Sequence, residues 1–86
     1  QGIICLGAVI KGDTAHFEYV AGECARGIAE MSRDTGVPIG FGVLATYDLE
    51  QALARSGPNE ENKGHEAANA VLDMINLLRA LDNVND

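Results

Sequence analysis

Two classes of protein are excluded by what this sequence has little of. Its 86 residues contain no Trp and only six Lys and Arg against thirteen Asp and Glu, which gives a net charge of −7. Proteins that follow a nucleic-acid backbone depend on clustered Lys and Arg, so nucleic acid is not an expected partner. No apolar run approaches the roughly 18 residues that span a bilayer, and no membrane partner is expected. We therefore expect a soluble, cytoplasmic protein.

Cysteine is also scarce. Cys5 and Cys24 form no CxxC motif and no cluster with His, so the sequence indicates neither a metal site nor a redox centre. We expect two reduced, buried thiols, and the alternative is a disulfide or a reactive thiol. The chain starts at Gln1 and enters an apolar run at once, so we also expect further residues upstream of it.

The apolar residues that are present predict a strand, a helix and a second strand. Ile3–Ile10 is a nearly continuous apolar run, which is typical of a strand buried on both faces of a parallel sheet. Spacings of three and four predict a helix from residue 17 to about residue 33, and Thr35, Gly36 and Pro38 end it. Residues 37–46 form the second predicted strand.

Two more helices are predicted in the second half of the chain. Asp48 and Gln51 form a start like a capping box for a short helix from Leu49 to about Arg55. After a polar loop at residues 59–64, a last helix carries a wide apolar face, and residues 83–86 are expected to fray. That face contains Ala67, Ala70, Val71, Met74, Leu77, Leu78 and Leu81. The order β-α-β-α-α predicts an α/β fold with a parallel sheet covered by helices on both faces.

The junction between the first strand and the first helix, Gly12 to Phe17, is the most informative segment. A strand ends, a glycine allows a tight turn and a helix begins, so free N–H groups and the positive end of the helix dipole converge. This geometry favours anion binding. The alternative is that Asp13 or Thr14 only caps the helix. The segment lacks the P-loop and dinucleotide-binding motifs, so neither kind of nucleotide is indicated.

Four other residues have a structural and a functional interpretation. His16 lies at a helix start, where it is a candidate for proton exchange with a ligand, and the structural interpretation is a neighbour of the cap or a surface residue. Arg55 either complements the end of its helix or holds an anion. Lys63 is a surface cation or a further anion contact. Phe41 belongs to the core, unless Gly40 and Gly42 leave room for a flat ligand beside its ring. His65 is interpreted as a surface residue.

Several segments, taken in order, resemble the 6,7-dimethyl-8-ribityllumazine synthase family. They are LGAVIKGDTAHFEYV (residues 6–20), GVPIGFGVL (36–44), EQALARSG (50–57), NKG (62–64) and MINLL (74–78). The resemblance implies a flavodoxin-like, three-layer α/β/α sandwich with a parallel sheet. It makes residues 1–86 the C-terminal part of a single domain whose upstream half is absent. It also implies pentamers, or multiples of them such as icosahedral shells, with active sites between adjacent subunits.

The same resemblance implies an enzyme of riboflavin biosynthesis that acts on small molecules. It joins 5-amino-6-(D-ribitylamino)uracil to 3,4-dihydroxy-2-butanone 4-phosphate and releases 6,7-dimethyl-8-ribityllumazine, phosphate and water. No metal or organic cofactor is implied, and riboflavin synthase is a further candidate partner. Two alternatives remain: a non-catalytic module of this fold that forms a shell or binds a flavin-like ligand, and a generic, monomeric phosphate-binding domain.

Roles for individual residues follow from the resemblance by position. The candidate site residues are His16 for proton transfer; Gly12, Asp13, Thr14 and Arg55 for phosphate; Ala8, Val9, Ile10 and Phe41 for the pyrimidine and ribityl groups; and Lys63 as a further candidate. Phe41 matches an aromatic that the neighbouring subunit presents to the ligand. Two features of the family are not in this chain: an upstream aromatic that stacks on the pyrimidine, and an upstream turn that contacts the ribityl group. The loop at residues 56–61 also departs from the family, with Asn59 where a cation is common.

Overall fold

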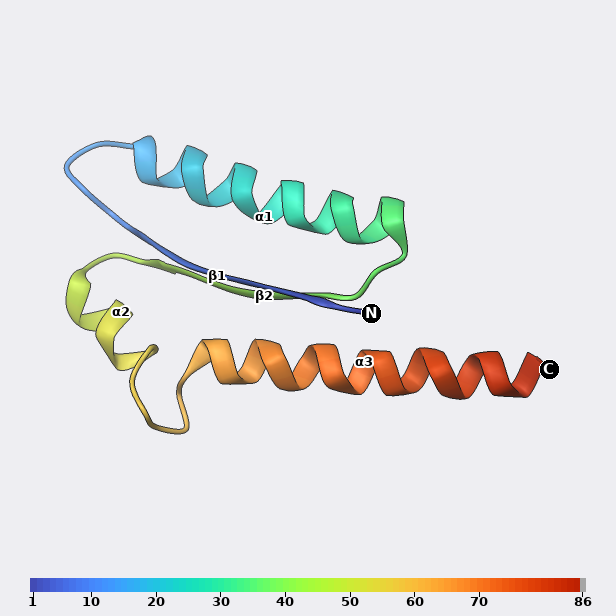
Figure 1. Ribbon diagram of the computed structural model, residues 1–86. Helices are drawn as coiled ribbons and strands as arrows, with labels where there is room; N and C mark the ends of the chain where they lie inside the picture. The colour runs from blue at the N-terminus through green and yellow to red at the C-terminus, as the bar shows by residue number, and fades with distance from the viewer. Residues whose placement is uncertain (86) are drawn as a thin grey trace.

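The protein is a three-layer α/β/α structure with the predicted order of elements. The computed structural model describes residues 1–85. Its elements are β1 (Ile3–Ile10), α1 (His16–Thr35), β2 (Ile39–Thr46), α2 (Leu49–Ala54) and α3 (Lys63–Asn85). Helix α1 covers one face of the sheet and α3 covers the other, while α2 follows the end of β2 (Figure 1). The α/β class and the flavodoxin-like layering are therefore confirmed.

The two strands pair in parallel, from Ile3 opposite Ile39 to Ile10 opposite Thr46. The ladder continues beyond both ends, because the Ile3 N–H donates to the Pro38 carbonyl at 3.0 Å and the Lys11 N–H donates to the Thr46 carbonyl at 2.9 Å. Strand β2 begins two residues later than the sequence predicts. Pro38 has no N–H to donate, which explains why regular pairing starts after it.

The core lies between β2 and the helices α2 and α3. Leu44, Ala52, Ala67 and Val71 are its buried apolar side chains. A Cβ placed on Gly40 would lie 2.6 Å from the Ala67 carbonyl oxygen, so this glycine lets the backbone of α3 approach the sheet. The close neighbour that the sequence predicts at Gly40 is thus α3 and not a ligand.

Strand β1 does not have the burial that its apolar sequence predicts. Its side chains are mostly exposed, and Leu6 retains 68% of its accessible surface. The sheet has two strands, so β1 has a neighbour on one edge, and α3 packs mainly against β2. The prediction of a strand buried on both faces is therefore wrong for these residues on their own.

Cys5 and Cys24 are free thiols as expected, but both are half-buried and not fully buried.

The ends of α1 and α2 follow their local sequence signals. Gly36 adopts the left-handed conformation, with φ 72°, and its N–H donates to the Ser32 carbonyl at 2.9 Å, which ends α1. The Asp48 carboxylate accepts a hydrogen bond from the Gln51 N–H at 2.8 Å, so the predicted cap of α2 is confirmed. The Gln51 side chain in turn accepts from the Tyr47 N–H at 2.9 Å.

Both ends of α3 differ from the prediction. The helix begins at Lys63, inside the predicted loop, because the Asn62 side chain accepts from the His65 N–H at 2.8 Å and caps it. It continues to Asn85, so the predicted fraying from residue 83 is wrong over the described residues; Asp86 lies outside them. Residues 79–85 contain neither Gly nor Pro to interrupt the helix. No helix within residues 1–85 is long and apolar enough to cross a membrane.

Candidate functional site

The turn between β1 and α1 leaves the start of the helix without a capping side chain. Ala15 is the N-cap residue, and no side-chain hydrogen bond caps the helix. The Thr14 hydroxyl accepts from the His16 N–H at a long 3.4 Å. Neither Asp13 nor Thr14 is therefore the N-cap residue, and Thr14 satisfies one N–H of the first turn through this long hydrogen bond. The N–H groups of the first turn remain suited to an anion.

A hollow of about 390 Å³ lies beside this turn, and most of the predicted site residues line it. Its lining residues are Ala8, Val9, Ile10, Gly12, Thr14, His16, Phe17 and Val20. The hollow therefore joins the end of β1, the turn and the first residues of α1, whereas Asp13 is not among its lining residues. We refer to it as the His16 hollow.

Gly12 does not serve as the tight-turn glycine that the sequence predicts. Within residues 1–85, Gly36 is the one residue with a positive φ, so the Gly12 conformation is open to other residues. A Cβ on Gly12 would meet no atom within 4 Å. Gly12 instead lines the His16 hollow and leaves open space over the backbone there.

Arg55 lies elsewhere. It lines a second hollow, of about 520 Å³, together with residues of α2 and the loop before α3. Its guanidinium Nη1 donates to the Gln51 carbonyl at 3.1 Å, which matches the structural interpretation of a cation at a helix end. Ala8 and Ile10 line both hollows, so β1 separates Arg55 from His16 within one chain.

Phe41 also lies away from the His16 hollow. It lines a third hollow with α1 residues, among them Ile28 and Arg33, and its side chain is 45% exposed. The expectation of a core phenylalanine is wrong. Because successive strand residues point to opposite faces, Gly40 and Gly42 face α3 while Phe41 faces α1. The two glycines therefore make no room beside the ring, and that part of the interpretation is also wrong.

The remaining cations are on the surface. The Lys63 ammonium lies 3.1 Å from the Glu66 carboxylate in an exposed ion pair. The exposed His65 ring lies 3.2 Å from the Asn69 amide, in agreement with its surface interpretation. Among the described residues, no group of three His, Cys, Asp or Glu side chains is placed to hold a metal ion.

One contact near the His16 hollow was missed by the sequence reasoning. The Phe17 and Tyr47 rings lie 6.0 Å apart at an angle of 45°, which joins the first turn of α1 to the corner between β2 and α2. Thirty residues separate the two rings in the sequence, and no local pattern links them.

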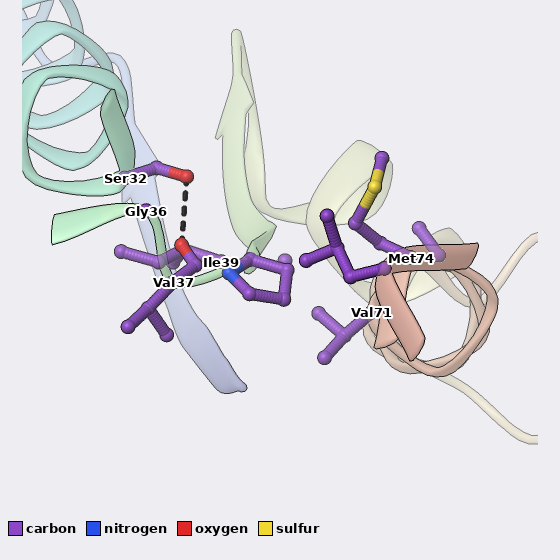
Figure 2. A pocket seen from close by; sticks show the side chains of 10 residues that line it. Ser32, Gly36, Val37, Ile39, Val71 and Met74 are labelled. Atoms are coloured by element: carbon purple, nitrogen blue, oxygen red, sulfur yellow. Dashed lines mark hydrogen bonds between the residues drawn. The ribbon is translucent and has the colours of Figure 1, made fainter. Parts of the chain in front are cut away.

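A further hollow, of about 340 Å³, lies at the other end of the sheet (Figure 2). Val71 and Met74 of α3 face Val37 and Ile39 there, and the Ser32 hydroxyl donates to the Val37 carbonyl at 2.9 Å. Its lining is apolar for the most part and includes none of the predicted site residues. The His16 hollow is therefore the better candidate site.

Comparison with known proteins agrees with the resemblance. The sequence model of the 6,7-dimethyl-8-ribityllumazine synthase family matches residues 1–79, which include every candidate site residue. The 6,7-dimethyl-8-ribityllumazine synthase of Syntrophus aciditrophicus (strain SB) is 54% identical over 81 residues, which are 94% of this chain and 53% of that protein. The chain thus spans about half the length of this relative. On this match, the chain belongs to the 6,7-dimethyl-8-ribityllumazine synthase family.

Proposed function

We propose that the protein carrying this chain makes 6,7-dimethyl-8-ribityllumazine from 5-amino-6-(D-ribitylamino)uracil and 3,4-dihydroxy-2-butanone 4-phosphate, releasing phosphate and water. The observation that carries this proposal is the His16 hollow, where a candidate proton carrier, an uncapped helix start and a strand end adjoin one space. The name of the 54% identical relative supports the same reaction.

Each part of the hollow has a chemical task in this proposal. The N–H groups of the turn at Gly12, Asp13 and Thr14 bind the phosphate, since a helix N-terminus favours an anion. The backbone of Ala8, Val9 and Ile10 holds the pyrimidine and its ribityl chain. His16 moves protons during imine formation, phosphate loss and ring closure. Holding two reactive molecules side by side removes much of the entropic barrier.

We further propose that the complete site forms between two copies of the protein. Arg55 and Phe41 line hollows other than the one that His16 lines, so a second copy would have to supply them to the same ligand. Such a head-to-tail interface closes into a ring, in keeping with pentamers or multiples of them. We also propose that residues 1–86 are the C-terminal part of one domain, that the protein is cytoplasmic and that riboflavin synthase is a partner.

The reaction is tested by mixing both substrates with the complete protein and following lumazine fluorescence. We expect product formation that falls by roughly 100-fold or more in His16→Ala and also falls in Arg55→Ala, given the usual contribution of a general acid or base. Arg26→Ala is the control, because this exposed arginine pairs with Glu23 and Glu30 on α1. Full activity of the His16→Ala/Arg55→Ala double variant would refute the site. Riboflavin binding without turnover would favour the non-catalytic alternative.

The shared site is tested by mixing subunits. When His16→Ala and Arg55→Ala proteins are dissociated together and reassembled in equal amounts, about one quarter of random neighbouring pairs combine an intact His16 with an intact Arg55. We therefore expect the mixture to recover about a quarter of the wild-type rate. A mixture no more active than its two parents would place both residues in one subunit's site. Light scattering then distinguishes a ring from the monomeric alternative.

A further inference from the structure

We infer that Tyr47 is a positioning residue for the His16 hollow, acting through its ring contact with Phe17; this inference rests on the proposed function. Phe17 is in the first turn of α1 and lines the hollow beside His16, whereas Tyr47 does not line it. The Phe17–Tyr47 pair, with ring centres 6.0 Å apart, therefore joins the site to a part of the chain outside it.

The turn before α1 needs such a contact because it holds itself in place weakly. Residues 11–16 are all exposed, and no side chain caps the helix that follows them. At one end, the Lys11 N–H donates to the Thr46 carbonyl at 2.9 Å, which fixes the turn to the end of β2. At the other end of the turn, Phe17 packs against Tyr47, which directly follows Thr46 in the sequence. Consecutive residues of one corner thus hold both ends of the turn.

The corner that carries Tyr47 is itself well held. Thr46 is buried, and its hydroxyl donates to the Asp48 carbonyl at 3.0 Å. The Tyr47 N–H donates to the Gln51 side chain at 2.9 Å, and Asp48 caps α2. Figure 1 shows this corner and the start of α1 at the same end of the sheet. A ring presented from a fixed corner restricts the first turn of α1, and with it the N–H groups and the imidazole that face the hollow.

The test compares Tyr47→Ala with Tyr47→Phe in the complete protein. Losing an aromatic pair of this kind changes the equilibrium between the ordered and the displaced first turn of α1 by about 3- to 10-fold. We expect Tyr47→Ala to raise KM for the phosphate substrate by about that factor and to leave KM for the pyrimidine unchanged. Tyr47→Phe keeps the ring and should behave as wild type. An equal loss in Tyr47→Phe would assign the effect to the hydroxyl and overturn the inference.

Tyr19→Ala is the matched control, because Tyr19 is also on α1's first two turns and is 72% exposed, against 69% for Tyr47. It should change neither KM, and a loss equal to that of Tyr47→Ala would overturn the inference. If Tyr47→Ala does not fold, Phe17→Leu removes the contact from the other side and should raise the same KM. Where both single variants fold, the double variant should lose no more than Phe17→Leu alone, because Phe17 also lines the hollow and the ring contact is already gone.

Amide hydrogen exchange separates failure of this inference from failure of the proposed function. We expect the amides of residues 18–20, which follow the unbonded start of α1 and begin its backbone hydrogen bonds, to exchange about 3- to 10-fold faster in Tyr47→Ala than in wild type, Tyr47→Phe or Tyr19→Ala. Faster exchange in a protein that makes no lumazine would refute the proposed reaction and support the positioning role. Unchanged exchange would overturn the positioning role even in an active enzyme.

Discussion

Replacing Gly40 by alanine tests how tightly α3 packs on the sheet. The new Cβ would lie 2.6 Å from the Ala67 carbonyl oxygen and 2.7 Å from Val71 Cγ2, whereas ordinary contacts begin at 3.4 Å. The Val71 methyl can rotate away, but the Ala67 carbonyl belongs to the backbone of α3. The helix would therefore have to move outward by most of an ångström and loosen the buried contacts of both residues.

Overpacking of this kind costs about 1–3 kcal/mol, and we place Gly40→Ala at about 2 kcal/mol because backbone must move. For a domain of the relative's size, this lowers Tm by roughly 4–8 °C, which thermal melts of the complete protein at fixed concentration would measure. Gly42→Ala, on the same strand face, should lower the free energy of unfolding by less. The atom nearest to its added Cβ, at 2.7 Å, is the end of the flexible Leu6 side chain.

Gly22→Ala on α1 is the opposite control, because a Cβ there meets nothing within 4 Å. Alanine at a helix position is favoured over glycine by roughly 0.5–1 kcal/mol, so this variant should melt slightly higher than wild type. If the Tm of Gly40→Ala were equal to or higher than that of the wild type, close packing of α3 would not be the reason for glycine at this position.

Three other variants follow from contacts in the structure, each measured by urea unfolding. Asp48→Ala removes the side-chain cap of α2 and should cost about 0.5–2 kcal/mol, while Asp48→Asn should retain most of the stability; equal losses would contradict the cap. Val71→Ala opens a space in the buried contact between α3 and Gly40 and should cost about 1–3 kcal/mol, and a negligible change would refute that packing. Arg26→Ala breaks two exposed ion pairs and should change stability by less than about 1 kcal/mol.

The elements of the fold could be predicted where short-range chemistry decides them. The end of α1 follows from Gly36, and the start of α2 follows from Asp48, because each signal acts over a few residues. The start of α3 differs from the prediction because the polar residues 59–64 indicate a loop, whereas Asn62 caps the helix; an Asn followed by helix formers is a sequence signal for such a cap. The exposure of β1 depends on how many strands surround it, which periodicity alone does not reveal.

The candidate site was predictable only in part, for a related reason. The strand end, the turn and His16 are close in sequence, so reasoning about one junction brought them together, and they line one hollow. A glycine at position 40 indicates that another group lies close to the backbone, but it does not identify that group. In the structure the neighbour is α3 and not a ligand. The Phe17–Tyr47 contact joins separate elements and becomes visible only in three dimensions.

The outer edge of β1 has a consequence for handling these residues in isolation. In a two-stranded sheet each strand has an edge whose backbone N–H and C=O groups are not used by its neighbour. On β1 that edge is bordered by exposed Ile3, Ile4 and Leu6, with no Pro or charged side chain within Ile3–Ile10 to discourage another strand from adding there. Residues 1–86 expressed alone should therefore self-associate through this edge into insoluble material, and Ile4→Lys or Leu6→Lys should increase the soluble yield.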